Sequence, residues 1–353
     1  MNVREFDFVL PSELIAQEPA AERSRARLLV LNRDSGALTH STVAALPDLL
    51  RAGDLLVVNN TRVFPARLVG RRIPSGGAVE CLLVRRIDAG ESTDCDRWEA
   101  LMHPGQKLKP GAEVVFQGER AIRGRVMERR FHGRRIIDLW TDDGSSVDEV
   151  VDAIGHVPLP PYVRRSDRQE DRDRYQTVYA RERGSVAAPT AGLHLSRPLL
   201  AALAEHGVGI AEITLHVGYG TFQPIRVERV EDHRLEPEHY EIGEDAAATI
   251  NQALDERRRI VTVGTTTTRT VEAVARAHHG RLVPGKGETD LFIHPGYDFG
   301  VVGGLLTNFH LPQSSLLMLV SALAGRERVL AAYRAAVEEH YRFYSYGDAM
   351  LIL

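Results

Sequence analysis

The chain has 353 residues, of which 43% are hydrophobic and 26% charged, and its formal net charge is -4. This length suffices for two domains, and the charge excludes a polycation, so any nucleic-acid contact must come from a local basic patch. The longest apolar run, residues 316–324, is too short to span a bilayer. Cys81 and Cys95 are the only cysteines, which argues against a disulfide framework and a cysteine zinc site. We therefore expect a cytoplasmic protein without a membrane contact, and we expect it to be a monomer or weak homo-oligomer.

Residues 55–58 form an apolar run that is typical of a strand buried on both faces of a sheet. Two amides, a hydroxyl and a guanidinium follow it directly, on Asn59, Asn60, Thr61 and Arg62. Ligands of open α/β sheets bind at such strand ends. We therefore predict a binding function for this segment, and the alternative is an Asn-Asn turn with a surface arginine.

Short alternating segments follow between residues 65 and 141, and turn-forming sequences separate them. Six segments at this spacing (66–73, 78–87, 97–102, 112–116, 121–128 and 134–140) predict a small antiparallel sandwich or barrel, residues 65–141, inserted into a domain made of residues 1–64 and 142–353. An excess of arginine between residues 120 and 135 predicts a contact with a phosphate backbone, and the alternative is a solvated charged face. These arginines are Arg120, Arg123, Arg125, Arg129, Arg130, Arg134 and Arg135.

Residues 156–165 include three prolines, which predicts an extended hinge that returns to the first domain. Further on, small residues surround Pro189 in the segment 188–194, where a backbone or a ligand can approach closely. Ser196 is the predicted cap of the next helix. His194 then lies at a loop-to-helix junction, where reactive groups and anion contacts are common. The alternative is a histidine that bonds a backbone carbonyl in a tight turn.

The predicted strand 209–216 runs into a loop in which two glycines flank Tyr219 and are followed by Thr221 and Phe222. This composition favours a ligand-facing loop with His216 at its start. The loop is no dinucleotide fingerprint, because its glycine spacing is wrong and no helix follows. A structural Gly-Tyr-Gly turn is the alternative.

A predicted strand at 259–263 leads through a turn rich in glycine and threonine, residues 264–270, into a predicted helix at 271–278. Strand, turn and helix in this order form anion sites at helix N-termini. The turn lacks the Gly-Lys-Ser/Thr of a P-loop, which disfavours nucleoside triphosphate hydrolysis. The candidate residues are Thr265, Thr266, Arg269 and, one turn into the helix, Glu272.

Residues 290–294 are a further predicted short strand. Later in the chain, polar residues again lie directly before a predicted helix. Thr307, Asn308 and His310 lie between an apolar run and the predicted helix 314–324. Strands alternate with helices outside the barrel, which predicts a mostly parallel α/β core.

Seven segments carry most of the distinctive sequence: 59–63, 175–179, 188–194, 216–222, 264–269, 292–297 and 307–312. In this order they closely resemble the S-adenosylmethionine:tRNA ribosyltransferase-isomerases of queuosine biosynthesis, and the resemblance covers nearly the whole chain. It implies an α/β domain with an inserted β-barrel, no metal and no bound prosthetic group. The implied reaction moves the ribosyl part of the co-substrate S-adenosylmethionine to 7-aminomethyl-7-deazaguanine at the wobble position of tRNA. The product is epoxyqueuosine, and adenine and methionine leave.

Such a reaction needs a base that removes a proton beside the sulfonium and an acid that assists the departure of adenine. His194, His216 and His310 suit both tasks, and which histidine takes which role stays open. Glu272 is a carboxylate that could orient a histidine or face the sulfonium, and Tyr219 and Phe222 offer cation–π contact or base stacking. The expected substrate-binding residues are Asn59, Asn60, Arg62, Thr190, Tyr219, Thr221, Phe222, Thr265, Thr266, Arg269 and Asn308.

Two other classes of function stay open from the sequence. An S-adenosylmethionine-dependent tRNA methyltransferase is disfavoured because the glycine-rich first strand-to-helix turn of the usual fold is absent. A non-catalytic RNA-binding protein would explain the arginine-rich barrel but not the polar clusters at four strand or loop ends. Release of adenine distinguishes the three classes.

Overall fold

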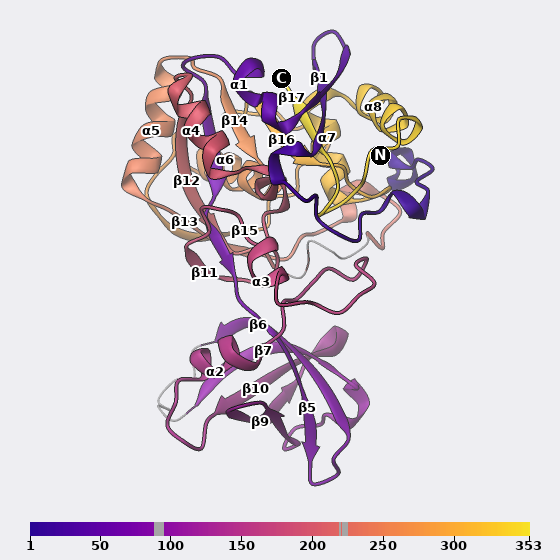
Figure 1. The fold of residues 1–353 in the computed structure, drawn as a ribbon, viewed down its shortest axis with the longest axis vertical. Helices are drawn as coiled ribbons and strands as arrows, with labels where there is room; N and C mark the ends of the chain where they lie inside the picture. Colours follow the sequence, from indigo (N-terminus) through magenta and orange to yellow (C-terminus); the bar gives the residue numbers. More distant parts are fainter. Residues whose placement is uncertain (88–94, 219, 221–224) are drawn as a thin grey trace.

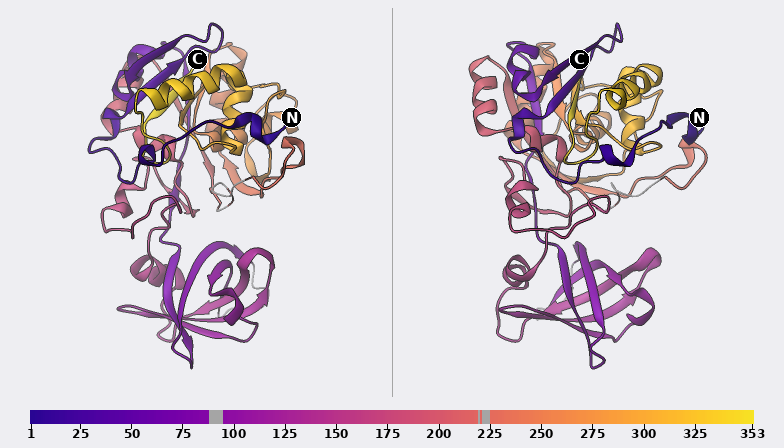
Figure 2. Two further views of the ribbon diagram at one scale, coloured as in Figure 1. Left: turned by 90° about the vertical axis from the view of Figure 1, so that its right-hand side faces the viewer. Right: turned by 45° about the vertical axis from the view of Figure 1, so that its right-hand side comes forward.

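The computed structural model describes residues 1–87, 95–218, 220 and 225–353. Within these ranges the chain forms a nine-stranded sheet flanked by helices, here called the sheet region, and a closed β-barrel (Figure 1). The barrel lies beyond one end of the sheet region in every view, and a narrow connection joins the two (Figure 2). The predicted α/β fold with an inserted antiparallel barrel is therefore confirmed.

The sheet is mixed. Its strands, in spatial order among the described residues, are β15 (Gly285–Thr289), β13 (Glu238–Ile242), β12 (Gly209–Leu215), β3 (Leu55–Asn59), β14 (Ile260–Val263), β16 (Gly304–Asn308), β17 (Ala349–Ile352), β1 (Arg27–Leu31) and β2 (Leu38–Thr42). The central strands β12, β3, β14 and β16 are parallel, as are β17 and β1. The other neighbours are antiparallel, so parallel pairing is less dominant than the sequence predicts.

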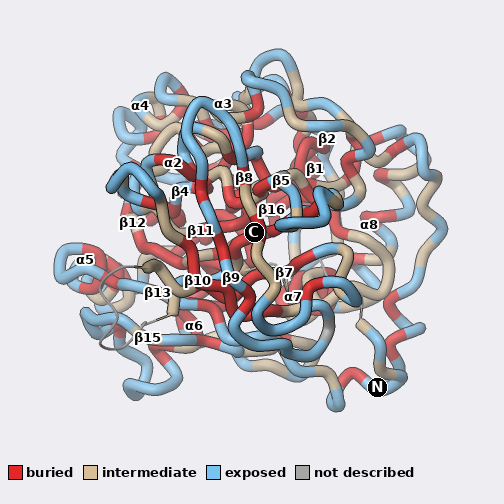
Figure 3. Tube along the Cα trace, turned by 90° about the horizontal axis from the view of Figure 1, so that it is seen from below, coloured by how far each residue is buried: buried red, intermediate tan, exposed pale blue. Residues whose placement is uncertain are grey.

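Strand β3 shows why the apolar run predicts a strand buried on both faces. Leu56 and Val58 pack with residues of α4 (Arg197–Glu205) on one face, and Leu55 and Val57 pack with residues of α5 (Glu244–Asp255) and α6 (Thr265–Ala277) on the other. Buried residues lie mainly in the interior of the molecule, and exposed residues lie mainly on its outer helices and loops (Figure 3). The α-helices are α1 (Leu46–Leu49), α2 (Val147–Ile154), α3 (Asp171–Arg174), α4 (Arg197–Glu205), α5 (Glu244–Asp255), α6 (Thr265–Ala277), α7 (Ser315–Ala324) and α8 (Arg326–Glu338).

The helix starts follow from local chemistry. The predicted cap Ser196 accepts the backbone N–H of Leu199 at 3.3 Å, and Ser314 accepts that of Leu317 at 3.2 Å. Helix α6 begins at Thr265, so the predicted turn 264–270 is wrong. Its threonines fit the first turns because their hydroxyls donate to carbonyls four residues back, as Thr267 does to Val263 at 2.7 Å. The strand predicted at 290–294 is also wrong. The strand in this part of the chain is β15, which ends at Thr289, just before the predicted range.

The barrel strands are β5 (Arg67–Ile73), β6 (Ala78–Ile87), β7 (Asp96–His103), β8 (Glu113–Gln117), β9 (Ala121–Arg129) and β10 (Arg134–Trp140). They pair antiparallel and close in the order β10-β7-β6-β5-β8-β9. Helix α2 packs on the apolar interior through Val150 and Val151. The predicted barrel segments therefore match the observed strands closely.

The connection between the barrel and the sheet region is a pair of adjacent chain segments. The chain leaves the sheet through β4 (Thr61–Val63), which pairs in parallel with β11 (Glu182–Ser185). Arg67 and His156 then exchange backbone hydrogen bonds of 3.2 and 2.8 Å where the chain enters and leaves the barrel. The described residues contain no helix that is long and apolar enough to cross a bilayer.

Candidate active site

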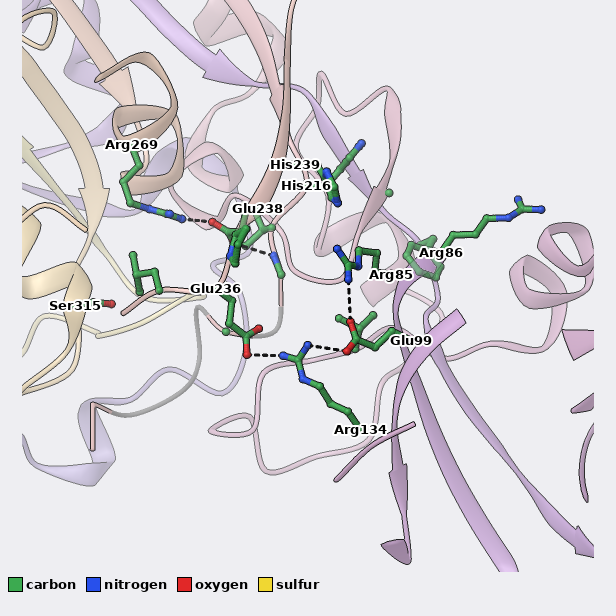
Figure 4. Close-up of a pocket in the computed structure, with 18 of the residues that line it drawn as sticks. Arg85, Arg86, Glu99, Arg134, His216, Glu236, Glu238, His239, Arg269 and Ser315 are labelled. Carbon is green, nitrogen blue, oxygen red and sulfur yellow. Dashed lines mark hydrogen bonds and ion pairs between the residues drawn. The ribbon is translucent and has the colours of Figure 1, made fainter. Parts of the chain in front are cut away.

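A cavity of about 640 Å³ lies between the barrel and the sheet region, and we call it the large cavity (Figure 4). Arg85, Glu99 and Arg134 line it from the barrel, and His216, Glu238 and Arg269 are among its lining residues from the sheet region. An ion pair joins its two walls, because Arg134 contacts both Glu99 at 3.3 Å and Glu236 at 2.5 Å. The cavity is therefore polar, and both parts of the chain build it.

His216 follows the last residue of β12 and is half-buried at the wall of the large cavity. Its Nδ1 lies 2.8 Å from the hydroxyl oxygen of Thr61, and this hydroxyl also lies 3.4 Å from the Glu182 carbonyl. A Cβ on Gly184 would lie 2.6 Å from the imidazole, so only glycine fits there. Burial, and then the neighbouring His239, lower the pKa of His216. The imidazole is therefore neutral near pH 7.

A second, smaller space of about 50 Å³ lies at the carboxyl ends of the parallel strands β14 and β16, and we call it the polar crevice. It shares Val217 and Leu316 with the large cavity, so the two adjoin. Strand ends of this kind are where open α/β sheets bind ligands. The predicted site residues that line it are Thr190, Thr265, Thr266, Asn308 and His310.

His194 and His310 are buried and contact the polar crevice differently. Nε2 of His310 lies 2.9 Å from the hydroxyl of Thr307, and burial lowers the pKa of His310 to about 3. Nε2 of His194 lies 3.1 Å from the Asn308 amide nitrogen, and burial together with Arg342 and Arg23 lowers its pKa to about 4. His194 itself lines a separate small pocket, so it reaches the crevice only through Asn308.

Asn308 is the polar group of the crevice with spare bonding capacity. Its amide nitrogen also donates to the Tyr344 carbonyl at 3.0 Å. Its Oδ1 is buried and has no hydrogen-bond partner among the described residues. A buried acceptor without a partner costs free energy, so a ligand N–H or O–H is a fitting partner for it.

Glu272 lies apart from the three histidines, and its bonds favour a structural role over the predicted catalytic one. The carboxylate is buried and accepts the backbone N–H groups of Gly300, Val301 and Val302 at 2.9 to 3.0 Å. The Tyr297 hydroxyl also donates to it at 3.3 Å. Among the described residues it lines only a pocket that holds none of the three histidines. Glu272 therefore anchors the loop before β16 to helix α6.

The polar residues after β3 are also mostly structural. Asn59 is fully buried, and its amide donates to the Leu215 carbonyl and accepts the Leu215 and Thr61 N–H groups. Asn60 bonds Glu212 at 3.3 Å and Thr214 at 2.7 Å. Arg62 is exposed and lines neither the large cavity nor the polar crevice, as far as the described residues show. The bonds of Asn59 and Asn60 assign them a structural role, and the predicted substrate contact of Arg62 stays a prediction.

The predicted residues Tyr219, Thr221 and Phe222 lie outside the described residues. Sequence reasoning missed Thr61 as the partner of His216 and Glu238 as the partner of Arg269. Glu238 comes from β13, an added antiparallel strand, and no motif marks it. Its position follows only from the pairing of β13 with β12.

The seven arginines predicted to bind tRNA are not equivalent. Arg135 is buried, and its guanidinium donates to the backbone carbonyls of Gly105, Leu108 and Arg134, which argues against its predicted tRNA contact. Arg129 is exposed and has no carboxylate within ion-pair distance in the described ranges. The other five form the pairs Arg120–Glu149, Arg123–Asp142, Arg125–Glu113, Arg130–Glu128 and Arg134–Glu236.

Within residues 1–87, 95–218, 220 and 225–353, no group of three or more His, Cys, Asp or Glu side chains is placed to hold a metal ion. The fold and the site define an α/β protein whose inserted barrel closes one wall of a polar cavity beside the carboxyl ends of the central strands. The family model described as "Queuosine biosynthesis protein" matches residues 3–352, and the chain belongs to this family.

Relatives agree over the full length. Proteins named S-adenosylmethionine:tRNA ribosyltransferase-isomerase from Desulfitobacterium hafniense and Symbiobacterium thermophilum are 49% and 50% identical, and each alignment covers all of both chains. The crystal structure of S-adenosylmethionine tRNA ribosyltransferase from Thermotoga maritima is 36% identical. The structural match has a TM-score of 0.54 and covers 99% of this chain and 100% of that chain.

Proposed function

We propose that this protein is an S-adenosylmethionine:tRNA ribosyltransferase-isomerase. It transfers and rearranges the ribosyl part of S-adenosylmethionine onto 7-aminomethyl-7-deazaguanine at the wobble position of tRNA, forms epoxyqueuosine, and releases adenine and methionine. Relatives of that name are 49% and 50% identical to this chain over its full length, which supports the proposal. The large cavity carries it on the structural side, because it has the volume of a small-molecule site and opens between the sheet region and the barrel.

His216 is the best candidate for the general base. When the Thr61 hydroxyl donates to the Glu182 carbonyl, its oxygen accepts the Nδ1–H of His216, and Nε2 then carries the lone pair. The lowered pKa keeps this nitrogen unprotonated near neutral pH, ready to take a proton from the carbon beside the sulfonium. His194 and His310 are buried beside other polar groups, and we assign them to the support of the crevice.

The polar crevice suits the parts of S-adenosylmethionine that must be held and released. Thr190, Thr265 and Thr266 offer hydroxyls, and the Asn308 Oδ1 offers an acceptor for an amino or hydroxyl group. His194 contacts the Asn308 amide nitrogen through its Nε2. Binding here and in the adjoining large cavity would place the ribose between the crevice and His216.

The barrel, which we take as a domain of residues 65–141, is proposed to contact the tRNA. The arginines on its surface, other than the buried Arg135, are the candidates for phosphate contacts. The reaction as proposed needs S-adenosylmethionine as co-substrate and no prosthetic group. A tRNA substrate is consistent with a cytoplasmic location.

The fate of labelled atoms tests this function. S-adenosylmethionine labelled in the methyl group and, separately, in the ribose is supplied with tRNA that bears the deazaguanine amine. The methyl label should appear only in methionine and the ribose label only in tRNA, with one adenine released per transfer. A methyl label in tRNA, or S-adenosylhomocysteine as product, would overturn the proposal in favour of a methyltransferase. Tight tRNA binding without any turnover would favour a non-catalytic RNA-binding protein.

A further inference from the structure

Arg269 is a buried cation at the wall of the large cavity. It lies on helix α6, one turn after Thr265, so both side chains project from the same face of the helix. Arg269 is 4% exposed and forms an ion pair with Glu238 of β13, which is 6% exposed. The two side chains point toward one another across the cavity wall (Figure 4). We call them the Arg269–Glu238 pair.

The pair leaves part of the guanidinium without a partner. Only Nη2 donates to Glu238, and neither Nε nor Nη1 has a hydrogen-bond partner among the described residues. Buried N–H donors without acceptors are unfavourable, and more so on a charged group. The Glu238 carboxylate is fixed from a second side, because it accepts the Gly218 N–H at 2.9 Å. A ligand oxyanion would satisfy the remaining donors of Arg269.

We propose that the Arg269–Glu238 pair binds the amino-acid end of S-adenosylmethionine, with Arg269 on the α-carboxylate and Glu238 on the α-ammonium group. This inference rests on the proposed function, because that reaction supplies the ligand. An amino-acid terminus carries both charges on neighbouring groups, and an adjacent guanidinium and carboxylate are its complement. The pair thus sets which sulfonium compounds the enzyme accepts.

A tRNA phosphate is the other oxyanion that the reaction brings to the site, and the geometry disfavours it. A phosphodiester carries only negative charge, so the adjacent Glu238 would repel it. It is also part of a continuous backbone, whereas the donors of Arg269 are almost fully buried. The methionine part of S-adenosylmethionine is an unbranched chain end that can reach the buried donors of Arg269.

Equilibrium binding of two ligands tests the inference without turnover. The ligands are S-adenosylmethionine and its decarboxylated form, which keeps the sulfonium and the amino group but lacks the carboxylate. Binding is measured with the whole protein, alone and with tRNA that has guanine at the wobble position and therefore lacks the acceptor amine. We expect at least tenfold weaker binding of the decarboxylated form. Equal affinity of the wild-type protein for both ligands would overturn the inference.

Two variants assign this discrimination to the pair. Replacing both partners, Arg269→Met with Glu238→Leu, leaves no buried unpaired charge and should abolish the difference in affinity between the two ligands. Arg269→Lys keeps the positive charge but lacks the planar set of guanidinium donors, so it should reduce the discrimination in part. This variant provides a second test if the double variant does not fold. Discrimination that is unchanged in a folded variant would contradict the inference. So would a variant that loses only tRNA affinity, since this would place a phosphate at Arg269.

The inference and the proposed function fail in different ways. If labelled ribose never reaches tRNA but the carboxylate-dependent binding is present and is lost in the variants, the proposed reaction is wrong and the binding site stands. If ribosyl transfer occurs with equal affinity for both ligands, the reaction stands and the Arg269–Glu238 pair has another role.

Discussion

At the scale of single residues, His194 acts on the polar crevice through Asn308. The imidazole Nε2 accepts from the same amide nitrogen that donates to Tyr344, so it fixes the direction in which Oδ1 points. We predict that His194→Ala lowers kcat about tenfold to a hundredfold, because an orienting hydrogen bond is worth about 1.4 to 3 kcal/mol. Steady-state kinetics on tRNA bearing the deazaguanine amine measures this change.

His194→Gln is the matched control, because its side-chain oxygen can accept the same hydrogen bond. It should recover a large part of kcat, with a melting temperature close to that of the Ala variant. Near-normal turnover of His194→Ala would show that the histidine serves packing alone.

The buried histidines also predict how stability depends on pH. Their folded pKa values are about 4 for His194 and about 3 for His310, against about 6.5 in an unfolded chain. Below pH 6.5 the unfolded state therefore binds more protons, and the free energy of unfolding falls as the pH falls. Each histidine contributes about 1.4 kcal/mol per pH unit until its folded pKa is reached.

Urea unfolding between pH 6 and 5 measures this slope. His310→Gln, which can still bond Thr307, should reduce the slope by about 1.4 kcal/mol per pH unit. A slope that is the same in the variant and the wild type would mean that His310 is charged in the folded protein.

At the scale of secondary-structure elements, Glu272 connects helix α6 to the loop 297–302. Three backbone N–H groups and one hydroxyl converge on a single carboxylate. We predict that Glu272→Gln lowers the free energy of unfolding by about 2 to 4 kcal/mol, because an amide NH₂ then faces N–H donors. Amide exchange at residues 300–302 should become faster, while kcat of the folded enzyme changes little. A hundredfold loss of kcat at unchanged stability would instead return Glu272 to the catalytic residues.

The elements that could be predicted are those whose pattern is local. Short, partly alternating segments separated by turn residues mark the barrel strands, and an unbroken apolar run marks β3. Threonine runs suggest a turn before α6, yet the hydroxyls bond within the helix, which then starts at Thr265. The sequence also predicts polar groups at strand ends, but it cannot tell an amide that binds ligand from one that ties strands together. Asn59 and Asn308 both end a buried strand, and the structure distinguishes them: the side-chain oxygen of Asn59 accepts two backbone N–H groups, and that of Asn308 has no partner among the described residues.

At the scale of the whole molecule, the barrel is expected to hold the tRNA. We predict that Arg129→Glu with Arg130→Glu weakens tRNA binding and makes its dependence on salt less steep. The slope of log K against log salt should change by up to about 2, since each lost phosphate contact accounts for about 0.7 to 0.9. The effect of Arg130 should be the smaller one, because Glu128 already neutralises it.

The matched control replaces Arg328 and Arg334, two exposed arginines of α8 on the sheet region, by glutamate. It changes the net charge equally and should leave the salt slope unaltered. An unaltered slope for the barrel variant as well would exclude this face. The groove of about 960 Å³ beside residues 158–166, where Arg164 and Arg226 are exposed, would then be the next surface to test.

The shared construction of the large cavity has a thermodynamic consequence. The sheet region and the barrel each supply part of its wall, and the chain joins them only through the adjacent segments at Arg67 and His156. If, as proposed, S-adenosylmethionine occupies the cavity and tRNA binds the barrel, the small molecule contacts both parts and the two ligands should be energetically linked. By reciprocity, the factor by which tRNA changes the affinity for S-adenosylmethionine equals the factor by which S-adenosylmethionine changes the affinity for tRNA.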